Sequence, residues 1–146
     1  MVIILIILFA WPRLSNSNKE EREKIARWES IGVECLTNGH NNPAQHIHPQ
    51  LQILVDGQKR IIPKDIGVVK SCMAEVHTHD DTGEIHIESI YAGKQFTLQQ
   101  FMDVWEENLE TEGYTLEMIV DGLPSTELGN LILTDKQQVI LNYTKQ

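Results

Sequence analysis

Cys-Met-Ala-Glu-Val-His-Thr-His-Asp-Asp-Thr-Gly-Glu-Ile-His-Ile-Glu-Ser, from Cys72 to Ser89, is the stretch around which the chain is organised. Polar and apolar residues alternate in both of its halves, and the Asp-Asp-Thr-Gly between them predicts the loop of a β-hairpin. A loop over residues 80–83 places His77 opposite His86, whereas a turn centred one residue later places His79 opposite His86. In either register, one face of the hairpin carries histidine and glutamate side chains and the other is apolar.

The histidines are the residues of this chain that point most directly to chemistry. All six lie between His40 and His86, a clustering typical of a metal-binding tract. Opposed Cβ atoms on one face of a hairpin are about 4.5 to 5.5 Å apart, close enough for two imidazoles to bind one ion. Copper or zinc is the predicted ion, because neutral imidazole is a common ligand for both. The predicted ligands, in order of preference, are His77, His86, His79, His48, His46 and Asp80.

Other roles for these residues remain open at this point. Glu84 and Glu88 could complete the coordination of an ion, orient the imidazoles, or serve as the base of a metal-dependent hydrolase or oxidase. Against any metal, the same side chains could lie on the solvated face of a half-buried sheet, and the domain would then bind a partner protein without metal. Neither His-Glu-x-x-His nor Gly-x-Ser-x-Gly occurs, so no catalytic residue is assigned and enzyme activity is not predicted.

Charge narrows the choice of partners. The 146-residue chain has 12 basic and 21 acidic residues, a formal net charge of -9. Nucleic-acid binding is disfavoured, because it depends on basic side chains that neutralise phosphates. An acidic balance suits cation binding, although it also serves solubility.

The N-terminal residues point to a membrane. Residues 1–11 are all apolar, but a spanning helix needs about 20 such residues. The run resembles the apolar part of a signal peptide, without the basic residues before it or a small-residue cleavage site after it. We therefore expect residues 1–14 to be a truncated signal or anchor segment, and the protein to be extracytoplasmic, either membrane-anchored or secreted. A buried strand is the alternative for this run.

The two cysteines fit an extracytoplasmic location. In an oxidising compartment Cys35 and Cys72 are expected to form one disulfide. In a cytosolic protein the bridge would be absent, and Cys72, five residues before His77, would be available as a soft metal ligand.

The rest of the chain predicts one α+β domain over residues 33–146, preceded by a polar linker, helical in part, over residues 15–32. Thr97 and Gln100 form a capping box at the start of a predicted helix over 98–109. The expected architecture is a small mixed sheet built of β-hairpins, with this helix packed on one face. The closing segment, from residue 119 to residue 141, resembles the end of a β-grasp (ubiquitin-like) fold, which says little about function.

A longer resemblance covers residues 46–101. Its His-x-His, His-Thr-His-Asp and Gly-x-Ile-His-Ile-Glu-Ser elements resemble those of a family of uncharacterised secreted or membrane-anchored bacterial and archaeal proteins. The resemblance implies an extracytoplasmic location and a bound metal, and it assigns no catalytic residue.

Overall fold

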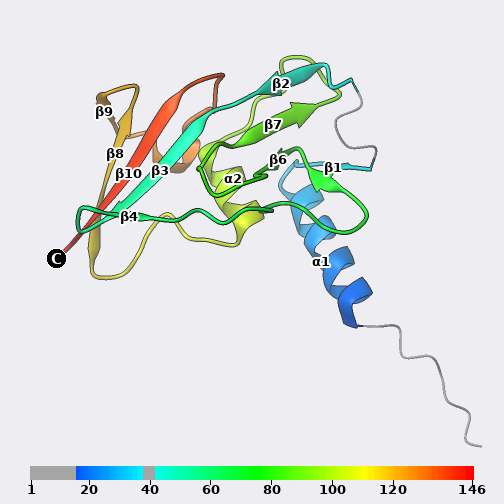
Figure 1. Ribbon diagram of the computed structural model, residues 1–146, viewed down its shortest axis with the longest axis horizontal. Coiled ribbons are helices and arrows are strands. Elements are labelled where there is room, and N and C mark those ends of the chain that lie inside the picture. Colours follow the sequence, from blue (N-terminus) through cyan, green and yellow to red (C-terminus); the bar gives the residue numbers. More distant parts are fainter. Residues whose placement is uncertain (1–15, 38–41) are drawn as a thin grey trace, which may run out of the picture.

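The computed structural model describes residues 16–37 and 42–146 of the chain (Figure 1). The expected signal or anchor segment at residues 1–14 and His40 lie outside these ranges. Within them, no helix combines the length and the apolar character needed to cross a bilayer. The described chain is a mixed α+β structure, which confirms the predicted fold class.

The largest sheet has five strands in the order β4-β3-β10-β8-β9. Its last strand, β10, lies in the middle, parallel to β3 and antiparallel to β8. Two hairpins with Asp-Gly turns flank it, at Asp56-Gly57 and Asp121-Gly122, and all four residues have the positive φ that a two-residue hairpin turn of type I′ requires. Two hairpins around a central last strand is the order expected of a β-grasp domain, a likeness that stays a prediction. The strands are β3 (Gln50–Val55), β4 (Gln58–Arg60), β8 (Tyr114–Val120), β9 (Leu123–Ser125) and β10 (Gln138–Lys145).

A second sheet of three strands carries the histidine hairpin, to the right of the five-stranded sheet in Figure 1. Its order is β2-β7-β6, with β2 at Gln45–Ile47, β6 at Val76–His77 and β7 at His86–Ser89. In β6 and β7, His77 pairs with His86, which confirms the register predicted for a loop over 80–83.

The hairpin loop is fixed against the larger sheet. The backbone N–H of Leu51 donates to the carbonyl of Gly83, 2.9 Å away, and Ile85 N–H donates to the carbonyl of Pro49 at the same distance. Gly83 has a φ of +89°, and a Cβ at this position would collide with the carbonyl of Leu51. Only glycine allows this close approach, so the histidine hairpin is held at a defined position beside β3.

Helix α2 (Leu98–Trp105) begins with the predicted capping box, since the Thr97 side chain and the Gln100 side chain each bond the other's backbone N–H. The helix ends earlier than the predicted residue 109, because Glu106 adopts a left-handed conformation with a φ of 66°. Leu109 is nevertheless buried, and its carbonyl accepts a hydrogen bond from the Tyr143 hydroxyl at 2.8 Å. Apolar side chains therefore continue at helical spacing beyond the end of the helix. A short 3-10 helix, Leu128–Asn130, packs against α2.

Helix α1 (Asn16–Ser30) occupies most of the predicted polar linker. It contacts α2 and β1 (Cys35–Leu36), and the Trp28 side chain is only 2% exposed. The carbonyl of Ile31, just after the helix, accepts a hydrogen bond from Gln100 Nε2 at 2.8 Å. The segment is thus packed against the domain that follows it, which its polar composition did not indicate.

Strand β1 forms a third, two-stranded sheet with β5 (Met73–Ala74), in which Cys35 pairs with Ala74. A disulfide joins Cys35 to Cys72, whose Cα atoms are 5.7 Å apart. The bridge links the N-terminal part of the domain to the start of the histidine hairpin. A disulfide of this kind fits an extracytoplasmic protein.

Candidate metal centre

One face of the β2-β7-β6 sheet gathers the site residues. His46 pairs with Glu88 across β2 and β7, and His77 pairs with His86 across β6 and β7. His86 and Glu88 are two residues apart on β7, so their side chains lie on the same face. The opposite face carries Val76 and Ile87, both fully buried in the core. The period-two alternation of the sequence therefore separates a core face from a histidine face.

The histidine face is buried at its centre and exposed at its margins. His77 and Glu88 are 0% exposed, and the His86 side chain is 18% exposed. His46 lies at the margin, with 40% of its side chain exposed, and His79 is also exposed. The alternative of a solvated sheet face therefore does not describe His77 and Glu88, whereas His46 and His79 do contact solvent.

His77 is held in one orientation by the backbone. Its Nδ1 lies 2.8 Å from the carbonyl of Ala74, and because a carbonyl only accepts, Nδ1 must carry the proton. In the neutral ring, Nε2 is then the atom with the lone pair. Histidines that bind metals usually donate their other ring N–H to a carbonyl or carboxylate in this way.

The lone pair of His77 is directed at a second imidazole. Its Nε2 lies 3.1 Å from Nε2 of His79, and the two rings are nearly perpendicular, at 75°. Two imidazoles bound to one tetrahedral zinc ion at about 2.0 to 2.1 Å have ligand nitrogens about 3.3 Å apart. The observed separation is thus close to that of two ligands of one ion.

Two overlapping sets of side chains have the geometry to hold an ion. In the first, which we call the inner group, one ligand atom from each of His77, His79, His86 and Glu88 lies within 4.8 Å of each of the others. In the second, the outer group, the same is true of His46, His48 and His86. His86 belongs to both groups.

His86 has an unusual environment for a polar ring. Its Nδ1 atom is buried and has no hydrogen-bond partner among the described residues, while its Nε2 lies 3.3 Å from Glu84 Oε1. Burial lowers the pKa of His86 below its ordinary value, and the neighbouring His79 and His48 lower it further. A neutral ring with a buried nitrogen lacking a partner is chemically suited to donate a lone pair to a cation.

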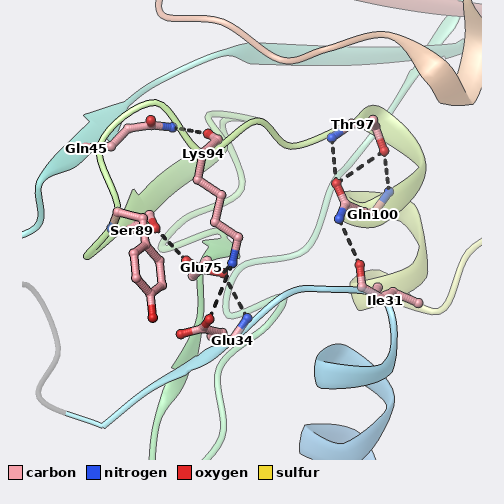
Figure 2. A network of polar contacts seen from close by, with 9 residues as sticks. Ile31, Glu34, Gln45, Glu75, Ser89, Lys94, Thr97 and Gln100 are labelled. Atoms are coloured by element: carbon pink, nitrogen blue, oxygen red, sulfur yellow. Dashed lines mark hydrogen bonds and ion pairs between the residues drawn. The ribbon is translucent and has the colours of Figure 1, made fainter.

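The two buried carboxylates of this region differ in their surroundings. Glu75 accepts hydrogen bonds from Ser89 Oγ at 2.6 Å and from Glu34 N at 2.9 Å, and it is paired with the ammonium group of Lys94 (Figure 2). Glu88 instead lies among imidazoles, with its Oε1 3.2 Å from His46 Nε2. Burying a carboxylate is costly unless a positive charge offsets it, and a bound cation would offset the charge of Glu88 as Lys94 offsets that of Glu75.

Five of the six predicted ligands are brought together by the structure, and Asp80 is not. One Asp80 carboxylate oxygen accepts hydrogen bonds from the hydroxyl of Thr82 at 2.6 Å and from its backbone N–H at 2.9 Å. These two bonds lower the pKa of Asp80, the hydroxyl having the larger effect. Asp80 is exposed, belongs to neither group and orders the hairpin loop instead.

The carboxylate that lies with the candidate ligands is that of Glu88, which the sequence analysis named only as a residue that could complete the coordination. The sequence did indicate that Glu88 lies near His86, because Glu88 follows His86 at the spacing that puts both side chains on one face of a strand. Its burial was not visible in the sequence, since it results from pairing with β2, more than forty positions earlier in the chain.

The donor atoms of the inner group are three imidazole nitrogens and one carboxylate oxygen. Such a set suits a divalent transition metal, because hard ions such as Mg²⁺ and Ca²⁺ prefer oxygen ligands throughout. The described residues therefore include a histidine cluster that could hold a metal ion.

Comparison of the chain with protein families, with curated protein sequences and with solved structures returned no match. The resemblance to secreted or anchored proteins that share its histidine motifs accordingly stays a prediction, and the case for this site depends on its geometry.

Proposed function

We propose that this protein is an extracytoplasmic metal-binding module that carries, takes up or senses a copper or zinc ion at the inner group. The observation that carries the proposal is the convergence of four ligand atoms, from His77, His79, His86 and Glu88, on one small region. They come from two paired strands and the loop between them, so the backbone fixes their relative positions.

The orientation of the imidazoles supports binding over chance clustering. The Ala74 carbonyl fixes the tautomer of His77, and Glu84 lies within reach of the second nitrogen of His86. Both arrangements leave one nitrogen of each ring for an ion, and partners of this kind raise the basicity of a metal-ligating imidazole. A solvated histidine has no need of either arrangement.

Copper and zinc are favoured over other ions by their affinities. Both are bound well by imidazole, and they lie at the strong end of the order of divalent affinities. Three imidazoles and one carboxylate provide the four ligands of a tetrahedral zinc ion, and nitrogen and oxygen donors also suit copper(II). The location is supported by the Cys35–Cys72 disulfide and by the apolar residues 1–11.

The direct test is metal analysis of the full chain, purified without an affinity tag, followed by titration with Cu²⁺ and Zn²⁺ at about pH 7.5, where imidazole is mostly neutral. We expect saturable binding of one equivalent of one or both ions. If neither ion binds saturably, the metal proposal is wrong, and a metal-free interaction domain becomes the better interpretation of the fold.

Three variants locate the ion. The double substitution His77→Ala with His86→Ala should abolish tight binding, and His79→Ala should weaken it by about 10- to 100-fold. Because His79 is exposed, its substitution is compatible with folding even if loss of the buried His77 is not. Asp81→Asn is the matched control, since Asp81 is an exposed acidic residue of the same loop and belongs to neither group. Unchanged affinity in His79→Ala would contradict the assignment.

A further inference from the structure

The centre contains more ligands than one ion can use. Five imidazoles and one carboxylate belong to the inner and outer groups together, whereas a zinc ion takes four ligands. Either the protein binds two ions at once, or one ion has two positions. The shared residue, His86, decides between these arrangements.

A neutral imidazole has only one nitrogen with a lone pair, because the other nitrogen carries a proton. His86 therefore cannot bind an inner and an outer ion at the same time unless it also loses its remaining N–H proton. Without His86, the outer group is reduced to His46 and His48, since Glu88 is not part of that group. The two positions thus compete for one ligand, which favours a single ion.

The two positions also differ in access. The inner group has two fully buried members, His77 and Glu88, and the outer group has none. His46 and His48 line an open surface hollow of about 410 Å³, together with charged side chains that include Glu84, Asp135 and Lys136. A hollow of this size admits a hydrated ion or an ion bound to a small chelator.

We propose that the outer group is the entry position for the ion, which then moves to the inner group while His86 remains bound. This inference rests on the proposed function. In the transfer, the bonds from the ion to His46 and His48 break, and bonds to His77, His79 and Glu88 form. The oxidation state of the ion does not change. The proton on Nε2 that His79 shares with His77 in the metal-free protein moves to solvent or to Nδ1 of His79.

The distances along this route are short. The ring centroid of His86 is 4.7 Å from that of His48 on the outer side and 4.5 Å from that of His79 on the inner side. The ion therefore exchanges ligands between neighbouring rings and is never fully released into water. Losing ligands one at a time avoids the cost of a bare ion, so the outer group should speed both entry and exit.

The test separates rates from affinity. Using the full chain and the ion that titrates saturably, Cu²⁺ or Zn²⁺ alone, association is followed by stopped flow and dissociation by competition with a chelator. In His46→Ala with His48→Ala, we expect association and dissociation both to slow by about tenfold or more, the size of effect typical of losing residues around a metal site. The dissociation constant should change much less than either rate. His46→Gln with His48→Gln repeats the test with side chains that preserve polarity, and Asp81→Asn is the control.

Three results would overturn this route. Unchanged rates in both double variants would show that the ion enters beside His79 directly. Two tightly bound equivalents in the unmodified protein would show two simultaneous sites. Both results leave the proposed function standing, whereas the absence of saturable binding in the unmodified protein would remove the proposed function and the entry route together.

Discussion

At the scale of single residues, His86 connects the chemistry of the site to the stability of the fold. Its pKa is lowered in the folded protein, by burial first and then by its histidine neighbours. An unfolded chain binds a proton at histidine near pH 6.5. As the pH falls below about 6.5, the unfolded state binds a proton that the folded state resists, so the free energy of unfolding decreases until the pH passes the folded pKa.

We therefore expect the thermal midpoint of the metal-free protein to fall when the pH is lowered from about 7.5 to about 5.5, a range over which histidine takes up its proton. In His86→Gln this fall should be smaller, because the group whose protonation is resisted is gone. The measurement is calorimetry in the presence of a chelator, so that loss of metal does not contribute. Equal falls in the two proteins would show that burial of His86 does not determine the acid sensitivity.

At the scale of elements, the histidine hairpin shows what local sequence can and cannot determine. The alternation on both sides of Asp-Asp-Thr-Gly predicted that a histidine pairs with His86 but left two registers open, and the structure has the one in which that histidine is His77. The hydrogen bond from Thr82 N–H to the Asp80 carboxylate also depends only on nearby residues, since aspartate in a turn commonly accepts a hydrogen bond from the residue two positions ahead. The burial of Glu88 could not be predicted, because it requires β2 to pair with β7. Long-range pairing leaves no period in the sequence.

The disulfide also acts at this scale, through the strand pair that it supports. Cys35 pairs with Ala74 in the β1-β5 sheet, and the carbonyl of Ala74 orients the His77 imidazole. The bridge, at Cys72, is two residues from that carbonyl. Removing the bridge should therefore loosen His77 as well as destabilise the chain.

For Cys35→Ser with Cys72→Ser we expect a loss of stability of about 3 to 4 kcal/mol, from the entropy that the loop gains in the unfolded state. Metal affinity should fall by about tenfold, because His77 loses part of its positioning. Serine is used because a free thiol would itself bind the ion. Urea denaturation and metal titration measure the two effects. A variant that is destabilised but binds metal with unchanged affinity would show that the β1-β5 pair does not support the site.

At the scale of the whole molecule, the candidate centre lies where the two larger sheets meet. Strand β2 leads directly into β3, and the turn before β10 is bonded to the same junction, through His48 N–H to Asp135 Oδ1 at 3.0 Å and Lys136 N–H to the His48 carbonyl at 3.2 Å. The hairpin loop is bonded to Leu51 of β3. Residues from the start, the middle and the end of the domain therefore fix the position of the histidines.

Because the hairpin that carries the candidate ligands is hydrogen-bonded to the five-stranded sheet at Leu51, a bound ion should stabilise the domain as one unit. An ion at about 100 times its dissociation constant stabilises the folded state by about 2.7 kcal/mol, which for a chain of this size raises the thermal midpoint by about 5 to 10 °C. The increase should appear as a shift of a single transition, because the hydrogen bonds between the two sheets should make them unfold together.

Calorimetry with and without Cu²⁺ or Zn²⁺ measures the shift of the thermal midpoint, and Asp81→Asn should respond as the unmodified protein does. His79→Ala should lose about half of the shift or more at the same ion concentration, as expected for a 10- to 100-fold loss of affinity. Two separate transitions, of which only one responds to the ion, would mean that the histidine sheet unfolds independently and that the centre does not couple the two sheets.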